Sequence, residues 1–141
     1  MYNRILLPLD NSPSDTTILN HIWPFAQLTG ARLILVHVAD GFAARLKDQL
    51  NLADSEEIKT DRQYLETCLK ALVDRGIKAT AHLVLGEPSD QILKLANQEK
   101  CDLIAMATHG HRLFKDLLLG SVADNIRHRT SIPILMIRAR A

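Results

Sequence analysis

Two short stretches in the last third of the chain have residue types and a spacing that suit the binding of an anion. They are Ala107-Thr108-His109-Gly110 and, after nine intervening residues, Gly120-Ser121-Val122. The first follows the apolar run 103–106, so we expect it to form a loop where a buried strand ends. We expect Gly120 to interrupt the helix before it and Ser121 to cap a new helix, with Asp124 in capping-box position. Free N–H groups at such a helix start bind phosphate, although an ordinary packed helix cap uses the same residue types.

Asp10 is the acidic residue best placed for chemistry, because it directly follows the apolar run 4–9. Its carboxylate would hold ribose hydroxyls or, through water, a metal ion; equally, it would cap the first helix or close a turn. The sequence contains none of the motifs GxxxxGK[ST], GxGxxG, GxSxG or HExxH. The residues therefore give no support for a hydrolase or a transferase, and we expect no catalytic residue.

The histidines do not form a convincing metal site. His109 and His111 flank Gly110 at a spacing that does not place both side chains on one helix face. This favours exposed loop histidines, or one that donates to a phosphate, over a zinc site. We interpret His37 and His82 as core or surface residues rather than ligands.

Length and composition indicate one globular domain over residues 1–141. The chain is 47% hydrophobic and 23% charged, and its net charge of +1 gives no reason to expect a nucleic-acid or membrane partner. No apolar run approaches the roughly 20 residues that span a bilayer, and the first residues lead directly into a strand-like run rather than a signal sequence. Cys68 and Cys101 lie among apolar neighbours without CxxC spacing, which favours reduced, packed thiols. We therefore expect a cytoplasmic protein.

Five apolar runs alternate with helical patterns along the chain. The runs are residues 4–9, 31–38, 77–85, 102–106 and 132–137. Ser12 is the predicted N-cap of the first helix and Pro13 its first residue, with a kink at Pro24 and an end at Gly30. Further helices are predicted over 54–76, after Gly86-Glu87-Pro88, and from Ser121. Residues 42–53 are ambiguous.

Strands that alternate with helices predict a parallel sheet with helices on both faces. Right-handed crossovers then favour a three-layer, doubly wound α/β fold with a flavodoxin-like or Rossmann-like sheet of five strands in the order 3-2-1-4-5. Pro133 cannot donate to a ladder and marks the start of an edge strand. Ligands of such sheets bind at the carboxyl ends of the strands, here where Pro8-Leu9-Asp10 meets the loop expected at 107–110.

Over essentially its full length the chain resembles the single-domain universal stress proteins. The resemblance is carried by Ile5–Pro13, His37-Val38, Gly86-Glu87-Pro88, Asp102–Gly110, Gly120–Ala123 and Pro133–Leu135. Part of this family binds ATP through the pattern Gly-x2-Gly-x9-Gly-[Ser/Thr]. Gly110, Gly120 and Ser121 match this pattern, whereas Ala107 replaces its first glycine. An ordinary backbone at Ala107 would tolerate the methyl group, but a positive φ would cost about 1 kcal/mol or more.

The resemblance implies a site for ATP, accompanied by Mg²⁺ or Mn²⁺, at the carboxyl ends of the first and fourth strands. The residues implied around the adenosine are Pro8, Leu9, Asp10 and Val38. Those implied along the rest of the site are Met106, Ala107, Thr108, His109 and Gly110. Those implied on the phosphates are Gly120, Ser121 and Val122.

The resemblance further implies a dimeric regulator of the stress response that binds ATP and at most hydrolyses it slowly. The dimer would form through the last strand, over Ile134, Leu135, Met136 and Ile137. A bare apolar edge strand invites aggregation, which independently favours a covered one. Two alternatives stay open: an interaction protein of the same fold, with an unidentified protein partner and no nucleotide, or a slow ATPase or phosphotransferase that uses Asp10 or His109.

Overall fold

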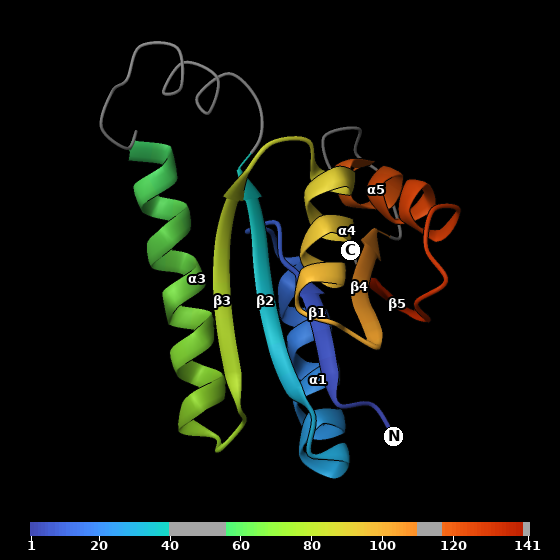
Figure 1. Cartoon of the computed structure of the whole chain (residues 1–141). Coiled ribbons are helices and arrows are strands. Elements are labelled where there is room, and N and C mark those ends of the chain that lie inside the picture. The colour runs from blue at the N-terminus through green and yellow to red at the C-terminus, as the bar shows by residue number, and fades with distance from the viewer. Residues whose placement is uncertain (40–55, 110–116, 140–141) are drawn as a thin grey trace.

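A single parallel sheet of five strands, in the order β3-β2-β1-β4-β5, runs through the middle of the fold (Figure 1). The computed structural model describes residues 1–39, 56–109 and 117–139, with the backbone alone for 109 and 117–121. The strands are β1 (Arg4–Pro8), β2 (Arg32–Ala39), β3 (Ala79–Leu85), β4 (Leu103–His109) and β5 (Ile134–Ala139). The helices are α1 (Ser14–Thr29), α3 (Glu56–Asp74), α4 (Pro88–Gln98) and α5 (Leu117–Arg127). The doubly wound α/β fold and the strand order predicted from the sequence are confirmed.

The central strand β1 joins the two halves of the sheet. It pairs in parallel with β2 along its whole length, from Arg4 opposite Arg32 onward. On its other side it pairs with β4, where Ile5 lies opposite Leu103. The chain winds outward from β1 to β3 and then returns to β4, so the winding direction changes between β1 and β4. Ligands of doubly wound sheets bind at the carboxyl ends of the strands at such a point.

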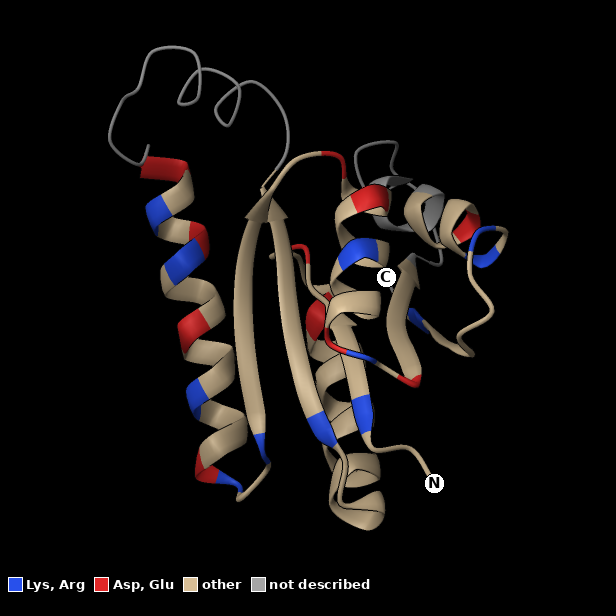
Figure 2. Cartoon of the chain, in the orientation of Figure 1, with Lys and Arg blue, Asp and Glu red and all other residues tan. Residues whose placement is uncertain are grey.

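Helices cover both faces of the sheet, with α1 and α3 on one face and α4 and α5 on the other (Figure 1). Adjacent strand residues face opposite layers: Ile5 and Leu7 pack toward α1 and α3, and Leu6 packs toward α4 and α5. Figure 2 shows β1 and β2 without charged residues beyond their beginnings, as expected for strands buried on both faces. Among the described residues, no helix is long and apolar enough to cross a membrane.

The ends of α1 and α4 follow local sequence signals, with one exception at the start of α1. Gly30 closes α1 in the left-handed region, at φ 72°, as predicted. At the start of α4 the Glu87 carboxylate accepts the N–H of Asp90 at 2.8 Å, next to Pro88 in the first turn. The predicted N-cap role of Ser12 is wrong, because α1 begins at Ser14 and no side chain caps it.

Strands β4 and β5 differ most from the sequence prediction, whereas the ends of β1, β2 and β3 differ by one or two residues. Strand β4 runs through His109 instead of ending at Met106, and β5 begins after Pro133 rather than at residue 132. Their pairing explains the difference, because Thr108 lies opposite Arg138 and continues the ladder past the apolar run. The positions of β3 and β5 at the two edges are as predicted. The ambiguous segment 42–53 lies outside the described residues.

Candidate functional site

The chain turns sharply from β1 into α1 at the carboxyl edge of the sheet. Leu9 donates its N–H to the carbonyl of Val36 at 2.9 Å, which continues the β1–β2 pairing by one residue. Asn11 then adopts a φ of 60°, a left-handed conformation that asparagine tolerates better than most residues. Between them, Asp10 is placed at the end of the sheet, and the hydroxyl of Ser12 donates to its carboxylate. Asp10 thus lies in a turn where Ser12 holds its carboxylate.

The carboxylate of Asp15 fixes this turn from inside the protein. It accepts the backbone N–H of Asp10 at 3.2 Å and that of Asn11 at 2.9 Å. It also accepts the hydroxyl of Tyr64, on α3, at 2.5 Å. Asp15 is only 1% exposed, and burial, aided by the nearby Asp10 carboxylate, raises its pKa to about 6 against the lowering effect of the Tyr64 hydrogen bond. The turn is thus built around a buried acid.

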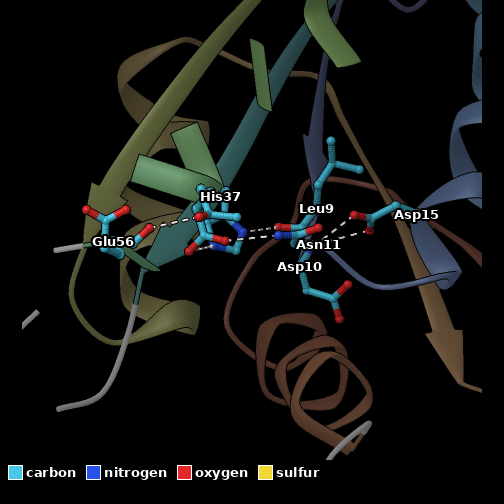
Figure 3. A network of polar contacts seen from close by, with 8 residues as sticks. Leu9, Asp10, Asn11, Asp15, His37 and Glu56 are labelled. Atoms are coloured by element: carbon cyan, nitrogen blue, oxygen red, sulfur yellow. Dashed lines mark hydrogen bonds and ion pairs between the residues drawn. The ribbon is translucent and has the colours of Figure 1, made fainter. Parts of the chain in front are cut away.

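His37, near the end of β2, connects the same turn to α3 (Figure 3). Its Nδ1 lies 2.8 Å from the carbonyl oxygen of Leu9 and, because that oxygen only accepts, Nδ1 donates. Its Nε2 lies 3.1 Å from the carboxylate of Asp61 on α3. The other oxygen of Asp61 accepts the side-chain amide of Asn11 at 3.1 Å. His37 is therefore a buried polar link at the site and not a simple core residue.

Two adjoining cavities lie at the carboxyl ends of β1 and β2. The smaller, of about 60 Å³, is lined by Pro8, Leu9, Asp10, Val36, His37, Val38, Pro88, Ile92 and Val122. The larger, of about 530 Å³, is lined by Asp10, Asn11, His37, Val38, Ala39, Glu56, Glu57, Thr60 and Asp61. Asp10, His37 and Val38 border both cavities, so the two form one hollowed region. Its larger part falls within the roughly 300–1,000 Å³ typical of small-molecule sites.

The two cavities offer different chemistry. Apolar side chains from β1, β2, α4 and α5 dominate the smaller one, which suits one edge of a flat, apolar ring. The larger one carries the carboxylates of Asp10, Glu56, Glu57 and Asp61, which favour hydroxyl or amino donors and repel phosphate. Within the described segments, no group of three or more His, Cys, Asp or Glu residues is arranged to hold a metal ion.

Five of the residues predicted for the site come together at the smaller cavity. They are Pro8, Leu9, Asp10, Val38 and Val122. Met106 and Ala107 are fully buried in the core instead, on opposite faces of β4, and neither side chain lines either cavity. The loop expected from Ala107 onward is wrong, because Ala107 and Thr108 belong to β4. Ala107 lies opposite Ile137 in the ladder and does not have a positive φ.

The glycine-serine pair lies within a helix rather than at the start of one. Helix α5 begins at Leu117, so the predicted helix start at Ser121, and the break at Gly120, are wrong. Asp124 is consequently not in a capping box, and its carboxylate pairs with Arg127 at 2.9 Å. The glycine continues the helix because it follows three leucines, which favour helix strongly. Gly110 and His111 lie outside the described residues.

Sequence reasoning missed three polar residues of this region: Asp15, Asp61 and Tyr64. The sequence marks Asp15 only as a favourable first-turn acid, and the two α3 residues carry no recognised signal. Asp61 and Tyr64 are three positions apart and hence on one helix face, next to the apolar stripe that includes Leu65. A polar pair between the apolar residues of one helix face is the signal that could have located them.

Comparison with known proteins agrees with this architecture. A model of the universal stress protein family matches residues 1–138. The universal stress protein MJ0577 of Methanocaldococcus jannaschii is 30% identical, with 99% of this chain and 97% of that protein aligned. A solved structure of MJ0577 has a TM-score of 0.84 at 31% identity and covers 99% of this chain and 98% of its own.

More distant solved structures share the fold. A universal stress protein in complex with cAMP has a TM-score of 0.70 at 20% identity, with 97% of each chain covered. One from Archaeoglobus fulgidus in complex with dAMP has a TM-score of 0.71 at 20% identity, covering 96% of this chain and 98% of its own. The family match over nearly the whole chain, the 30% identity to a relative aligned over 97% of its own length and the shared fold agree, and the chain belongs to the universal stress protein family.

Proposed function

We propose that this protein binds an adenine nucleotide, ATP in the first place, at the carboxyl ends of β1 and β4 and acts as a regulator of the stress response. The observation that carries the proposal is the convergence of residues from β1, β2, α4 and α5 on one hollow at the point where the winding of the sheet reverses. The ligands of two relatives of the same fold, cAMP and dAMP, support an adenine nucleotide in particular.

The charges around the site suggest how the nucleotide lies. We place the adenosine against Pro8, Leu9, Asp10 and Val38, which border the smaller cavity. The carboxylates of the larger cavity would repel a triphosphate, so the phosphates extend toward α5, where Val122 lines the smaller cavity. Mg²⁺ or Mn²⁺ would then be bound chiefly by the phosphates. Of the other residues implied by the resemblance, we propose Thr108, His109 and Gly110 along the site and Gly120 and Ser121 on the phosphates, whereas Met106 and Ala107 are buried in the core.

Ala107 is compatible with this proposal. An alanine in place of glycine would be strained where φ is positive, but Ala107 is a paired strand residue without a positive φ. Its methyl group is fully buried on the α1 side of the sheet, in the core cluster that contains Ile18 and Ile22. The methyl group therefore takes no space from the hollow on the α4 and α5 side.

We further propose that the protein forms a homodimer through β5 and works in the cytoplasm. Strand β5 is an edge strand with Met136 44% exposed, and pairing with a second copy would cover it. The proposed interface comprises Ile134, Leu135, Met136 and Ile137. Cys68 and Cys101 are buried free thiols, as expected in a reducing compartment.

The test is a calorimetric titration of nucleotide-free protein with Mg-ATP, and then with AMP and cAMP. The Asp10→Ala variant should weaken binding about tenfold, because it removes a polar group that borders both cavities. The matched control is Asp74→Ala, which removes the same charge from an exposed position on α3. It should bind as the unsubstituted protein does.

Two outcomes would replace the proposal. No heat and no thermal shift with any of the three nucleotides would favour an interaction protein of the same fold. Accumulation of ADP over many turnovers would favour a slow ATPase, and loss of that turnover in Asp10→Ala would then implicate Asp10.

A further inference from the structure

One face of helix α3 is apolar except near the candidate site, where two polar residues lie between the buried Ile58 and the buried Leu65. Toward the far end of the helix, Leu65, Cys68 and Leu72 are buried against the sheet. One turn closer to the site, the same face continues with Asp61 and Tyr64. These two side chains are largely sheltered from solvent, and both reach across to the turn after β1. These two polar residues therefore have specific partners in the turn.

The first anchor is Asp61, which connects to the turn by two routes. One oxygen lies 3.1 Å from Nε2 of His37, whose Nδ1 donates to the carbonyl of Leu9 at 2.8 Å. The other oxygen accepts the side-chain amide of Asn11 at 3.1 Å. Both oxygens of one carboxylate are thus committed to the residues on either side of Asp10.

The second anchor is Tyr64, which acts through Asp15. The Tyr64 hydroxyl donates to Oδ2 of Asp15, and the two oxygens of that carboxylate accept the N–H groups of Asp10 and Asn11. Asn11 needs such support because its φ of 60° is uncommon for a residue other than glycine. Tyr64 lies behind the turn and does not line either of the two cavities.

We propose that helix α3 is a positioning element for the nucleotide site: Asp61 and Tyr64 together hold the segment Leu9–Asn11 in its binding shape, through His37 and Asp15. This inference rests on the proposed nucleotide function, because it assigns a purpose to contacts that surround the adenosine residues. It also explains why a buried carboxylate is kept at Asp15, where an apolar side chain would avoid the unfavourable desolvation.

The test compares Tyr64→Phe with a matched variant of the same helix. Tyr64→Phe keeps the ring and removes only the hydroxyl that reaches Asp15. Leu72→Val trims a buried side chain of the same α3 face, away from the turn, and lowers the stability of the protein without touching the anchors. Two quantities are measured in each protein: the dissociation constant for Mg-ATP, and the hydrogen-exchange rates of the Asp10 and Asn11 amides, which both donate to Asp15.

In Tyr64→Phe we expect about tenfold weaker binding and about tenfold faster exchange of these two amides. In Leu72→Val both quantities should stay within about twofold of the unsubstituted protein, although its unfolding midpoint falls. Asp61→Asn, which alters the carboxylate that contacts His37 and Asn11, should weaken binding in the same direction as Tyr64→Phe. Equal effects of Tyr64→Phe and Leu72→Val on binding would overturn the positioning role and leave the nucleotide function intact. Failure of the unsubstituted protein to bind ATP, AMP or cAMP would overturn the nucleotide function itself.

Discussion

The hydroxyl of Tyr64 on α3 donates a hydrogen bond to the carboxylate of Asp15 on α1, with 2.5 Å between the two oxygens. This carboxylate has three donors in all, and hydrogen bonds to a charged acceptor are stronger than those between neutral groups. Burial nevertheless outweighs them and raises the pKa of Asp15 to about 6. Burial, together with the contact to Asp15, raises the pKa of Tyr64 as well, so the phenol keeps its proton and remains a donor.

The raised pKa of Asp15 predicts how stability depends on pH. The folded protein binds this proton more tightly than the unfolded chain, whose pKa is 3.8, so the Asp15 contribution to stability falls as pH rises from about 4 to about 6. The fall amounts to about 3 kcal/mol at most, at 1.36 kcal/mol per pKa unit. Urea unfolding at several pH values should show this slope in the unsubstituted protein and not in Asp15→Asn.

The informative quantity in that experiment is how the free energy of unfolding changes with pH, rather than its value at any one pH. Asp15→Asn turns an amide N–H group toward backbone donors, which lowers the free energy of unfolding of the variant but adds no titration of its own. The prediction would be contradicted if the free energy of unfolding changed with pH in the same way in both proteins.

Two glycines should differ in how much an added methyl group destabilises the protein. Gly30 ends α1 at φ 72° with open space where a Cβ would lie, so Gly30→Ala should cost about 1 kcal/mol. Gly86 has φ 137°, and a Cβ there would lie 2.9 Å from the side-chain nitrogen of Gln91. Because that conformation is almost restricted to glycine, Gly86→Ala should cost about 2–3 kcal/mol. Urea unfolding of both variants measures how much free energy of unfolding each one loses. Equal losses would show that the turn before α4 relaxes to accept the methyl group.

Ala107→Gly should leave nucleotide affinity unchanged while it lowers stability. Ala107 is a fully buried strand residue without a positive φ, so glycine brings no conformational gain. Glycine in a strand costs about 0.5–1 kcal/mol, and the lost methyl group about 0.8 kcal/mol more. Calorimetric titration and urea unfolding of the same preparation measure both effects. A tenfold gain in affinity would mean that the alanine impairs the site.

The proposed dimer predicts a change in mass on substitution of an exposed residue of β5. Met136 is 44% exposed at the sheet edge, and Met136→Glu would place a charge in the proposed interface. Sedimentation equilibrium should give twice the chain mass of 15.8 kDa for the unsubstituted protein and the single mass for the variant. Retention of the dimer in Met136→Glu would locate the interface elsewhere. Arg129→Glu, at an exposed position after α5, serves as a control that should stay dimeric.

The sheet could be predicted from the sequence because its strands are continuous apolar runs of the kind that only a doubly covered sheet buries. The end of β4 could not. Thr108 is a polar strand residue whose place depends on its partner Arg138, more than twenty residues later, and local pattern carries no such information. The start of α5 could not be predicted for the opposite reason, since the local signal at Gly120 is overridden by the leucines before it.

At the site, the residues at the strand ends could be predicted from the sequence. The residues that hold them in place, such as Asp15 and Tyr64, could not. Pro8 and Val38 lie near the ends of apolar runs and Asp10 follows one, and parallel strands bring such ends to one edge. Asp15 meets Tyr64 across 49 positions of sequence, and only the packing of α3 against the sheet brings them together. Contacts of this kind are properties of the assembled layers and not of any one segment.

The pairing of β1 with β4 also bears on the order in which the protein folds. At this seam Arg4 hydrogen-bonds to Asp102, 98 positions away, whereas β1–β2 and β4–β5 join segments much closer in sequence. Closing the longest loop carries the largest entropic penalty, so we expect the β1–β3 and β4–β5 halves to form before they join. Because the proposed nucleotide site spans the seam, it would be completed only in that last step, and ATP would recognise the finished fold and none of its precursors.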